Sequence, residues 1–223
     1  MGLYVDTSPK KQYYGLNNLD EKLERFVDKD DGFFVELGAN NGVDQSNTLY
    51  FEKFRNWRGV LVEPTLHNYL VCKANRSKIT KIFCNACTSF SYQEKFVEII
   101  YSNLMSTPIG LESDIGDPLQ HAQEGRRFLL KHEENVSFGA VARPLSFILD
   151  EADAPAVIDL LSLDVEGAEI EVLNGIDHDK YKFRYMCVES RSFERLNTLL
   201  VNVGYQFIEK LTVHDYLFAL LKV

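Results

Sequence analysis

The chain has few cysteines and no long apolar run, and these two shortages exclude two classes of protein. It has four cysteines in 223 residues, and their spacing does not resemble the disulfide framework of a small secreted domain. No apolar run approaches the roughly 20 residues of a membrane span, and the N-terminus lacks the apolar core of a signal peptide. We therefore expect a cytoplasmic protein with no membrane span.

Positive charge is also scarce. The 24 lysines and arginines are outnumbered by 33 aspartates and glutamates, which gives a net charge of −9. Such a chain is repelled by phosphate backbones and by anionic lipid. Apolar residues make up 45 % and charged residues 26 %, which is the balance of a globular protein. We therefore expect no nucleic-acid partner.

The chain also lacks repeats, low-complexity stretches and linkers, and its length favours one domain. Continuous apolar segments bounded by turn residues predict buried strands, and the stretches between them predict helices. The strands are expected at residues 33–37, 59–63, 79–84, 157–165, 185–189, 204–208 and 216–221. The helices are expected at residues 45–54, 66–75, 145–151, 168–173 and 193–203.

The middle of the chain departs from this alternation. Residues 95–101 predict a further strand, but the polar stretch that follows contains several prolines and glycines, which interrupt regular structure. We interpret residues from about 102 to about 142 as an irregular insertion with a short helix at residues 124–132. The prediction is one domain over residues 1–223 that contains this insertion.

The order of the elements predicts the fold class. Alternating strands and helices form an α/β protein with a doubly wound, mostly parallel sheet. The segments at residues 204–208 and 216–221 are joined by a short polar turn. This turn leaves no room for a crossover helix, so the last two strands should pair antiparallel. Ligands of such sheets bind outside the carboxyl ends of the strands.

Acidic and small residues gather at those strand ends. Glu36 precedes a turn that runs from Gly38 to Gly42, and small residues let a ligand approach the backbone. Glu63 ends the second strand, where an acid can accept hydrogen bonds from the hydroxyls of an adenosine ribose. The other strand ends carry Asn85, Asp164, Glu166 and Glu189. This coincidence predicts a site for a cofactor that contains adenosine.

The spacing of the glycines distinguishes among such cofactors. An NAD site places three glycines, as Gly-x-Gly-x-x-Gly, on a pyrophosphate, whereas here three residues separate Gly38 from Gly42. No Gly-Lys-Ser or Gly-Lys-Thr occurs, so a P-loop is absent. S-adenosylmethionine carries a cationic amino acid and no phosphate. The acidic and amide groups of Glu36, Asn40 and Asn41 suit this cofactor better than a phosphate.

Several segments together carry a resemblance to a known family. They are residues 33–42, 46–53, 57–64 and 161–169, with Asn75–Arg76 and Arg143–Leu145 as smaller pieces. The chain resembles the FkbM family of S-adenosylmethionine-dependent methyltransferases from about Tyr14 to Leu221, and the Asp-x-Glu-Gly-Ala-Glu block is the most specific of its motifs. The resemblance implies a class I methyltransferase fold, which is Rossmann-like and has a seven-stranded sheet with an antiparallel last strand.

The resemblance also implies an activity and a cofactor site. The implied activity is O-methylation of a hydroxyl on a sugar, a glycan or a glycosylated or polyketide-type natural product. Glu63 would hold the ribose, and Asn85 with Ala86 would border the adenine. Asp164 would face the reacting methyl group. Other residues of these segments are implied to bind the cofactor, some of them by wrapping its methionine part. They are Glu36, Gly38, Ala39, Asn40, Gly42, Ser46 and Pro64.

A hydroxyl acceptor needs a base, because its proton must leave as the new bond forms. Asp164 is the first candidate, with Glu166 or Glu189 second, since neighbouring carboxylates raise each other's pKa. The same three carboxylates could instead hold a magnesium ion, which prefers oxygen ligands. In a third interpretation, Asp164 binds the amino group of the cofactor and Glu166 caps the next helix.

The base could also come from the insertion, as His121 or His132. Close relatives often carry histidine after the glutamate of the fifth strand, but this chain has Ser190 there, so a histidine base is not available at that position. The residues at the start of the insertion that could line an acceptor pocket are Tyr101, Asn103, Met105 and Ser106.

The sequence leaves three other functions possible, and it does not decide whether the chain forms a homo-oligomer. The chain could methylate RNA or protein, although it has Asp164–Gly167 where many base-methylating enzymes carry an Asn/Asp-Pro-Pro-aromatic turn. It could bind an adenosine ligand without catalysis, or be an NAD oxidoreductase. A homo-oligomer is also open, because the aromatic N-terminal residues Tyr4, Tyr13 and Tyr14 could pack on their own domain or on a partner.

Overall fold

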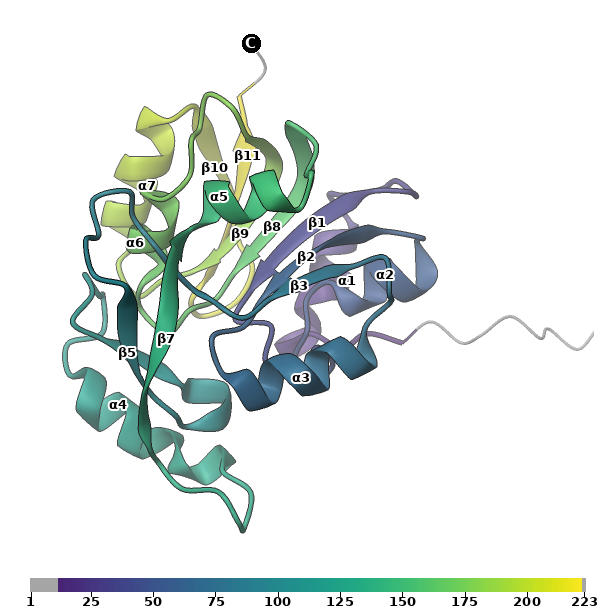
Figure 1. Ribbon diagram of the computed structural model, residues 1–223. Helices are drawn as coiled ribbons and strands as arrows, with labels where there is room; N and C mark the ends of the chain where they lie inside the picture. The colour runs from purple at the N-terminus through teal and green to yellow at the C-terminus, as the bar shows by residue number, and fades with distance from the viewer. Residues whose placement is uncertain (1–11, 222–223) are drawn as a thin grey trace, which may run out of the picture.

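The computed structural model describes residues 12–221, and its centre is a sheet of seven strands. In sheet order these are β10 (Tyr205–Lys210), β11 (Asp215–Leu220), β9 (Lys182–Glu189), β8 (Val157–Leu163), β1 (Phe33–Leu37), β2 (Arg58–Val62) and β3 (Lys81–Phe83). Strands β9, β8, β1, β2 and β3 pair in parallel, whereas β11 runs antiparallel to both of its neighbours. The predicted α/β sheet with an antiparallel last strand is confirmed (Figure 1).

Helices cover both faces of this sheet, which is why its central strands read as continuous apolar runs. One face carries α1 (Leu19–Glu24), α2 (Leu49–Phe54) and α3 (Leu66–Asn75), preceded by the short turn η1 (Leu16–Asn18). The other face carries α5 (Leu145–Glu151), α6 (Glu169–Leu173) and α7 (Phe193–Asn202). In β1, Phe34 packs into the first layer and Val35 into the second.

Residues 86–144 form a second, smaller sheet that the sequence did not predict. Its order is β4 (Ala86–Thr88), β7 (Ser137–Pro144), β5 (Phe96–Ile100) and β6 (Thr107–Ile109), and it comes with η2 (Asn103–Met105), α4 (Pro118–Glu124) and η3 (Gly125–Phe128). Figure 1 shows β5, β7 and α4 together below the seven-stranded sheet. Strand β7 was not predicted, because its pairing with β5 and β4 is long-range and its mixture of small, apolar and polar residues has no strong period.

Helix positions in this unit also differ from the prediction. The short helix expected at residues 124–132 lies earlier, as α4 and η3. The helix begins earlier because residues 117 and 118 favour a helix start. Pro118 occupies the first turn, and the Asp117 carboxylate accepts a hydrogen bond from the Gln120 amide.

Two boundaries in the larger sheet unit place site residues in loops. The helix expected at residues 45–54 begins only at Leu49, because the residues before it form a loop that is bonded to Glu36. Strand β8 ends at Leu163 and not at residue 165, so Asp164 and Glu166 lie in the turn after the strand. The strand expected at residues 157–165 is therefore two residues too long at its C-terminal end.

The N-terminal tyrosines that the structure describes pack on their own domain. The rings of Tyr13 and Tyr50 lie 4.7 Å apart, and Lys53 lies over the ring of Tyr14. Tyr4 lies outside the described residues. Within residues 12–221, no helix has the length and apolar character needed to cross a membrane.

Candidate active site

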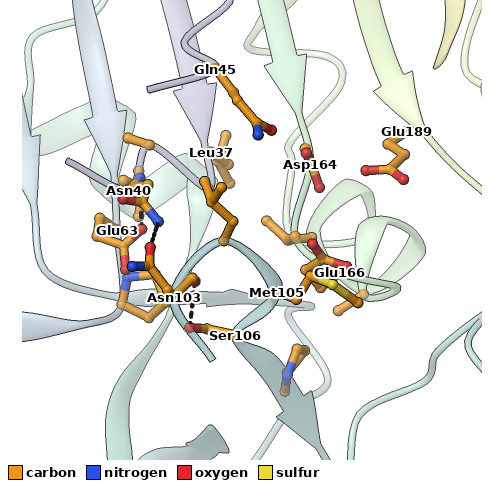
Figure 2. A pocket seen from close by; sticks show the side chains of 18 of the residues that line it. Leu37, Asn40, Gln45, Glu63, Asn103, Met105, Ser106, Asp164, Glu166 and Glu189 are labelled. Atoms are coloured by element: carbon orange, nitrogen blue, oxygen red, sulfur yellow. Dashed lines mark hydrogen bonds between the residues drawn. The ribbon is translucent and has the colours of Figure 1, made fainter. Parts of the chain in front are cut away.

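A cavity of about 580 Å³ opens beyond the carboxyl ends of β1, β2, β8 and β9. Figure 2 shows Asn40 and Glu63 on one side of it and Asp164 and Glu189 on the other. The residues predicted for the site that line this cavity are Glu36, Gly38, Ala39, Asn40, Ser46, Glu63, Pro64, Asn85, Ala86, Asp164, Glu166 and Glu189. Residues spread over more than 150 positions of the chain (189 − 36) thus meet at one place.

Asn41 and His132 do not line the cavity, and neither does Gly42, which was predicted to belong to the cofactor site. Its φ is +79°, and a Cβ atom there would lie 2.7 Å from Cys72 Sγ and 2.9 Å from Arg76 Cγ. Glycine is needed at this position for the backbone conformation and for the close approach of α3. The turn that carries Asn40 is therefore shaped by Gly42 from outside the cavity.

Gly38 shapes the cavity floor itself. Its φ is +78°, and a Cβ atom there would lie only 1.9 Å from the backbone oxygen of Asp164. The Gly38 amide also donates to the Val62 carbonyl. The ends of β1, β2 and β8 are thus packed backbone to backbone, and this packing sets how far Asp164 lies from the turn after β1.

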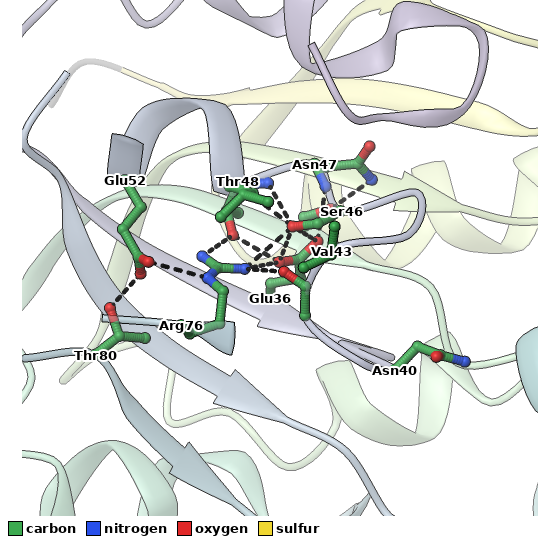
Figure 3. A network of polar contacts seen from close by, with 12 residues as sticks. Glu36, Asn40, Val43, Ser46, Asn47, Thr48, Glu52, Arg76 and Thr80 are labelled. Atoms are coloured by element: carbon green, nitrogen blue, oxygen red, sulfur yellow. Dashed lines mark hydrogen bonds and ion pairs between the residues drawn. The ribbon is translucent and has the colours of Figure 1, made fainter. Parts of the chain in front are cut away.

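The Glu36 carboxylate is buried and fully occupied within the protein (Figure 3). It accepts hydrogen bonds from Thr48 Oγ1 at 2.6 Å, from the Asn47 amide at 2.8 Å and from Ser46 Oγ at 2.9 Å. Arg76 Nη1 lies 3.5 Å from it. Glu36 therefore holds the loop that carries Ser46 and Asn47 against the sheet, and it shapes the cavity wall mainly through that loop.

Arg76 on the far side of Glu36 is a residue whose role the sequence did not predict. Its side chain is completely buried, and its Nε lies 3.2 Å from Glu52 Oε1. Its other donors reach Thr48 Oγ1 at 3.0 Å and the Gly42 carbonyl at 3.2 Å. One guanidinium thus connects α2, α3 and the turn after β1. The only sequence feature that pointed to Arg76 was the Asn75–Arg76 pair of the family resemblance. That pair does not indicate which groups the arginine contacts.

Glu63 joins the ends of β1 and β2. Its Oε2 accepts from the Asn40 amide at 2.9 Å and its Oε1 from the Thr65 amide at 2.8 Å. Burial raises the pKa of this carboxyl, although both hydrogen bonds oppose the shift. Each carboxylate oxygen has further lone pairs, so Glu63 can accept ribose hydroxyls while it keeps the turn in place.

On the opposite wall, three carboxyl groups lie close together. Burial, the negative charges of Glu189 and Glu166, and a hydrogen bond with Glu189 raise the pKa of Asp164 well above its usual range. Asp164 is nevertheless in contact with solvent, because it borders the open cavity. Glu166 adopts a φ of +54°, which is unusual for a residue with a side chain. This wall can therefore hold a proton or accept one.

A histidine and an arginine complete this wall. His121 Nε2 on α4 lies 2.6 Å from Glu166 Oε2. Arg191 Nη2, after the end of β9, lies 3.6 Å from Glu166 and 3.7 Å from Glu189. His121 was a sequence candidate for the base, whereas Arg191 was missed because an arginine in a loop after a strand carries no distinctive pattern.

Asp114 ties the smaller sheet unit to the end of β9. Its Oδ2 accepts from the Arg191 amide at 2.6 Å, from Ser190 Oγ at 2.8 Å and from the Ser192 amide at 3.2 Å. Its own amide donates to the Gly167 carbonyl at 3.1 Å. Ser190 is thus occupied in holding this segment.

The smaller sheet unit also supplies the remaining cavity wall. Asn103, Met105 and Ser106 line it as the sequence predicted. Tyr101 is not among the lining residues, and its hydroxyl donates to Glu133 Oε1 at 2.6 Å. The other lining residues that were not predicted include Gln45, Asn47, Pro108, Leu111 and Phe128.

Comparison with known families agrees with this geometry. The model of the Methyltransferase FkbM domain matches residues 36–207. The chain belongs to this family. Residues 36–207 include the cavity turn after β1, the Glu63 position and the carboxylate wall, so the match covers the site just described. No curated protein sequence matches the chain.

Solved structures of methyltransferases are similar to this FkbM methyltransferase at low sequence identity. A precorrin-6y C5,15-methyltransferase from Geobacter metallireducens is 13 % identical with a TM-score of 0.46, and the match covers 98 % of this chain and 92 % of that one. A human methyltransferase 10 domain containing protein is 12 % identical, with a TM-score of 0.47 and coverage of 91 % and 81 %. An S-adenosylmethionine-dependent methyltransferase from Aquifex aeolicus is 11 % identical, with a TM-score of 0.40 and coverage of 90 % and 87 %.

The chain is thus an S-adenosylmethionine-dependent methyltransferase of the class I fold, and the chemistry of the cavity fits the cofactor. S-adenosylmethionine carries two cationic groups, and the carboxyl groups of Asp164, Glu166 and Glu189 line the cavity. Glu63 offers acceptor oxygens for a ribose at the end of β2. Within residues 12–221, no group of three or more His, Cys, Asp or Glu side chains is placed to hold a metal ion.

Glu169, behind the carboxylate wall, gives a prediction about pH. Burial raises the pKa of Glu169 to about 8, although the Val165 and Gly167 amides donate to its Oε1. Because the folded-state pKa lies above the usual 4.5, the folded protein binds more protons than the unfolded chain between these values. Stability that Glu169 contributes at low pH is therefore lost as the pH rises from about 4.5 to about 8.

We expect Glu169→Gln to remove this pH dependence, because glutamine resembles the neutral acid and keeps an acceptor oxygen. Urea denaturation at several pH values should show a free energy of unfolding that falls less steeply for the variant, by at most about 1.4 kcal/mol per pH unit. Glu194→Gln, on the exposed surface of α7, corrects for the loss of one carboxylate. Parallel pH profiles for Glu169→Gln and the wild type would contradict the prediction.

Proposed function

We propose that this FkbM methyltransferase transfers the methyl group of S-adenosylmethionine to a hydroxyl group of a sugar, a glycan or a glycosylated small molecule. The observation that carries the proposal is the cluster of Asp164, Glu166 and Glu189 on one cavity wall. A hydroxyl is a poor nucleophile until its proton is removed. Burial and the two glutamates raise the pKa of Asp164 and so increase its affinity for a proton, which is the property that a base for this reaction needs.

The proposed mechanism needs alignment and proton removal from the protein. S-adenosylmethionine, when bound, supplies a methyl group that is already electrophilic. Holding the acceptor oxygen behind that methyl group contributes ~7–11 kcal/mol to lowering the barrier, and the cavity walls would provide this alignment. Asp164 would accept the hydroxyl proton, and a positioned base adds ~10²–10⁴-fold to the rate. His121, which contacts Glu166 at 2.6 Å, is the second candidate for the base.

The wall contributed by the smaller sheet unit supports a sugar-like acceptor. It lines the cavity with the apolar side chains of Met105 and Leu111 and with Asn103 and Ser106, which also bond to neighbouring groups of the protein. A sugar presents hydroxyl groups around its edge and apolar C–H groups on its faces. A few polar groups among apolar ones are typical of small-molecule pockets. RNA is a weaker candidate, because the net charge of −9 opposes a phosphate backbone.

Asp164→Asn is expected to lower the rate of methyl transfer ~10²–10⁴-fold, because asparagine cannot accept the hydroxyl proton. The affinity for S-adenosylhomocysteine should change less than about threefold, a free-energy change below about 0.7 kcal/mol. Both quantities can be measured on the same preparation, by transfer of tritium from labelled cofactor and by calorimetry. An unchanged transfer rate would remove Asp164 from the chemistry, and His121→Gln would then be the variant to measure.

The experiment that tests the proposed function is an acceptor screen with tritium-labelled S-adenosylmethionine. The panel should contain monosaccharides, glycosides and nucleotide sugars, together with total RNA and unfolded protein. Calorimetric titration with S-adenosylhomocysteine comes first, to establish that the purified protein binds the cofactor product. Label in a sugar hydroxyl supports the proposal, whereas label that enters only RNA or protein overturns it. Cofactor binding with no transfer to any acceptor favours a non-catalytic module.

A further inference from the structure

We infer that Asp164 and Glu189 share one proton in the cofactor-free protein and release it to solvent when the positively charged sulfonium group of S-adenosylmethionine binds. The pair would thereby distinguish the cofactor from its product, S-adenosylhomocysteine, whose sulfur is uncharged. The inference deepens the proposed function, because it makes the ionisation of the proposed base depend on the presence of the methyl donor.

The sheet itself places the two carboxyl groups together. Strands β8 and β9 are parallel neighbours, and Leu163 pairs with Val188 at the end of their shared register. Asp164 and Glu189 are each one residue further along, so both lie at the cavity edge of adjacent strands. Figure 2 shows their carboxyl groups on the same side of the cavity. Two carboxylates in such a position do not both ionise readily, and one proton is retained between them.

The surrounding charges favour that retained proton. Glu166 adds to the negative potential at Asp164. From the neighbouring strand β11, Asp215 lies opposite Glu189 in the antiparallel register. Arg191 lies 3.7 Å from Glu189, but it also faces Glu166 at 3.6 Å and Asp114 at 4.0 Å.

The other ionisable groups nearby are engaged elsewhere or are neutral. His121 on α4 contacts Glu166. Burial raises the pKa of Asp215, and His214 and Lys22 oppose this shift. Burial raises the pKa of the Cys187 thiol on β9, so it carries no charge at neutral pH. The positive charge available within the protein is therefore divided among several carboxylates.

A bound cation changes this balance. A positive charge near the pair favours the state with both carboxyl groups ionised, so the shared proton leaves for the buffer. S-adenosylmethionine and S-adenosylhomocysteine have the same adenosine and amino acid parts, so a difference between them isolates the sulfonium group. After methyl transfer the sulfur is neutral, the attraction to the pair is lost, and release of the product becomes easier.

Calorimetry can count the protons without any acceptor. Each ligand is titrated into the wild-type protein in buffers of different ionisation enthalpy, at several values from about pH 6 to about pH 9. We expect S-adenosylmethionine to release up to about one proton more than S-adenosylhomocysteine in part of this range. Equal proton release by the two ligands at every pH would overturn the inference and leave the proposed function intact. Failure of both ligands to bind would overturn both.

Variants test whether Asp164 and Glu189, and not other residues of the cavity, release the proton. Asp164→Asn and Glu189→Gln should each abolish the extra proton release and lower the affinity for S-adenosylmethionine about tenfold, with the affinity for S-adenosylhomocysteine within about threefold of wild type. Glu124→Gln, which removes a carboxylate from the α4 wall of the same cavity, should retain the extra release. Thermal melting identifies a variant that fails to fold. If Asp164→Asn and Glu189→Gln both fold and still release the extra proton, the shared proton does not belong to these two residues.

Discussion

Replacing Arg76 with methionine is expected to lower the free energy of unfolding by about 3–5 kcal/mol, one of the two largest effects that the structure predicts. The Arg76 side chain is completely buried between Glu36 and Glu52, whose carboxylates are also largely buried. Methionine has a similar length but no charge, so both carboxylates would be left without their buried cation. Removing one partner of a buried ion pair costs far more than the pair gains, because the remaining charge stays desolvated.

The Arg76→Met substitution should also weaken ligand binding in the cavity. Arg76 donates to Thr48 Oγ1 and to the Gly42 carbonyl, so the variant should bind S-adenosylhomocysteine at least about tenfold more weakly. Arg25→Met is the matched control, because Arg25 is 57 % exposed and its partner Glu209 is 3.7 Å away. An exposed pair of this kind contributes about 0–1 kcal/mol. Urea denaturation measures the free energy of unfolding of both variants. A similar decrease for the two would contradict the role of Arg76 as a buried ion-pair partner.

Gly38→Ala is expected to lower the free energy of unfolding by about 2–4 kcal/mol and to weaken binding of S-adenosylhomocysteine at least about tenfold. The new Cβ atom would lie 1.9 Å from the backbone oxygen of Asp164. This neighbour is backbone at the end of a central strand and cannot rotate away. Relief of the clash must therefore separate the ends of β1 and β8, which form the cavity floor.

The chain contains a control for this substitution. Gly110 has a φ of +79°, almost equal to that of Gly38, but a Cβ atom there would meet nothing within 4 Å. Gly110→Ala should therefore show only the backbone cost of the left-handed conformation, about 1 kcal/mol, with no change in ligand binding. Denaturant unfolding and calorimetry of both variants separate the clash from the backbone strain. Equal effects of the two substitutions would show that the contact with Asp164 is not important.

Prediction from the sequence succeeded where the signal was local. The apolar run of β1 predicted a strand buried on both faces, and the short turn between β10 and β11 predicted their antiparallel pairing. Polar residues that directly follow buried strands, such as Glu63 and Asp164, could be placed at one rim because parallel strands end on the same side of a sheet. This reasoning needed no information about side-chain contacts.

Prediction failed where the answer depended on contacts between distant segments. The pairing of β7 with β5 and β4 joins residues that have no common pattern, so the smaller sheet unit was missed. The contacts of the Glu36 carboxylate with Ser46, Asn47, Thr48 and Arg76 could not be predicted either. Nothing within the strand that carries Glu36 indicates that these partners come from elsewhere.

The sequence by itself determined the order of strands and helices, the reversed last strand and the family, because these depend on local apolar patterns and on contiguous motifs. Only the tertiary structure decided which groups touch. It placed Arg76 beneath the turn after β1, brought His121 of the smaller sheet unit to Glu166, and set Asp164 beside Glu189. These contacts join residues far apart in the chain, and their energies depend on burial and on charge separation, which exist only after the chain has folded.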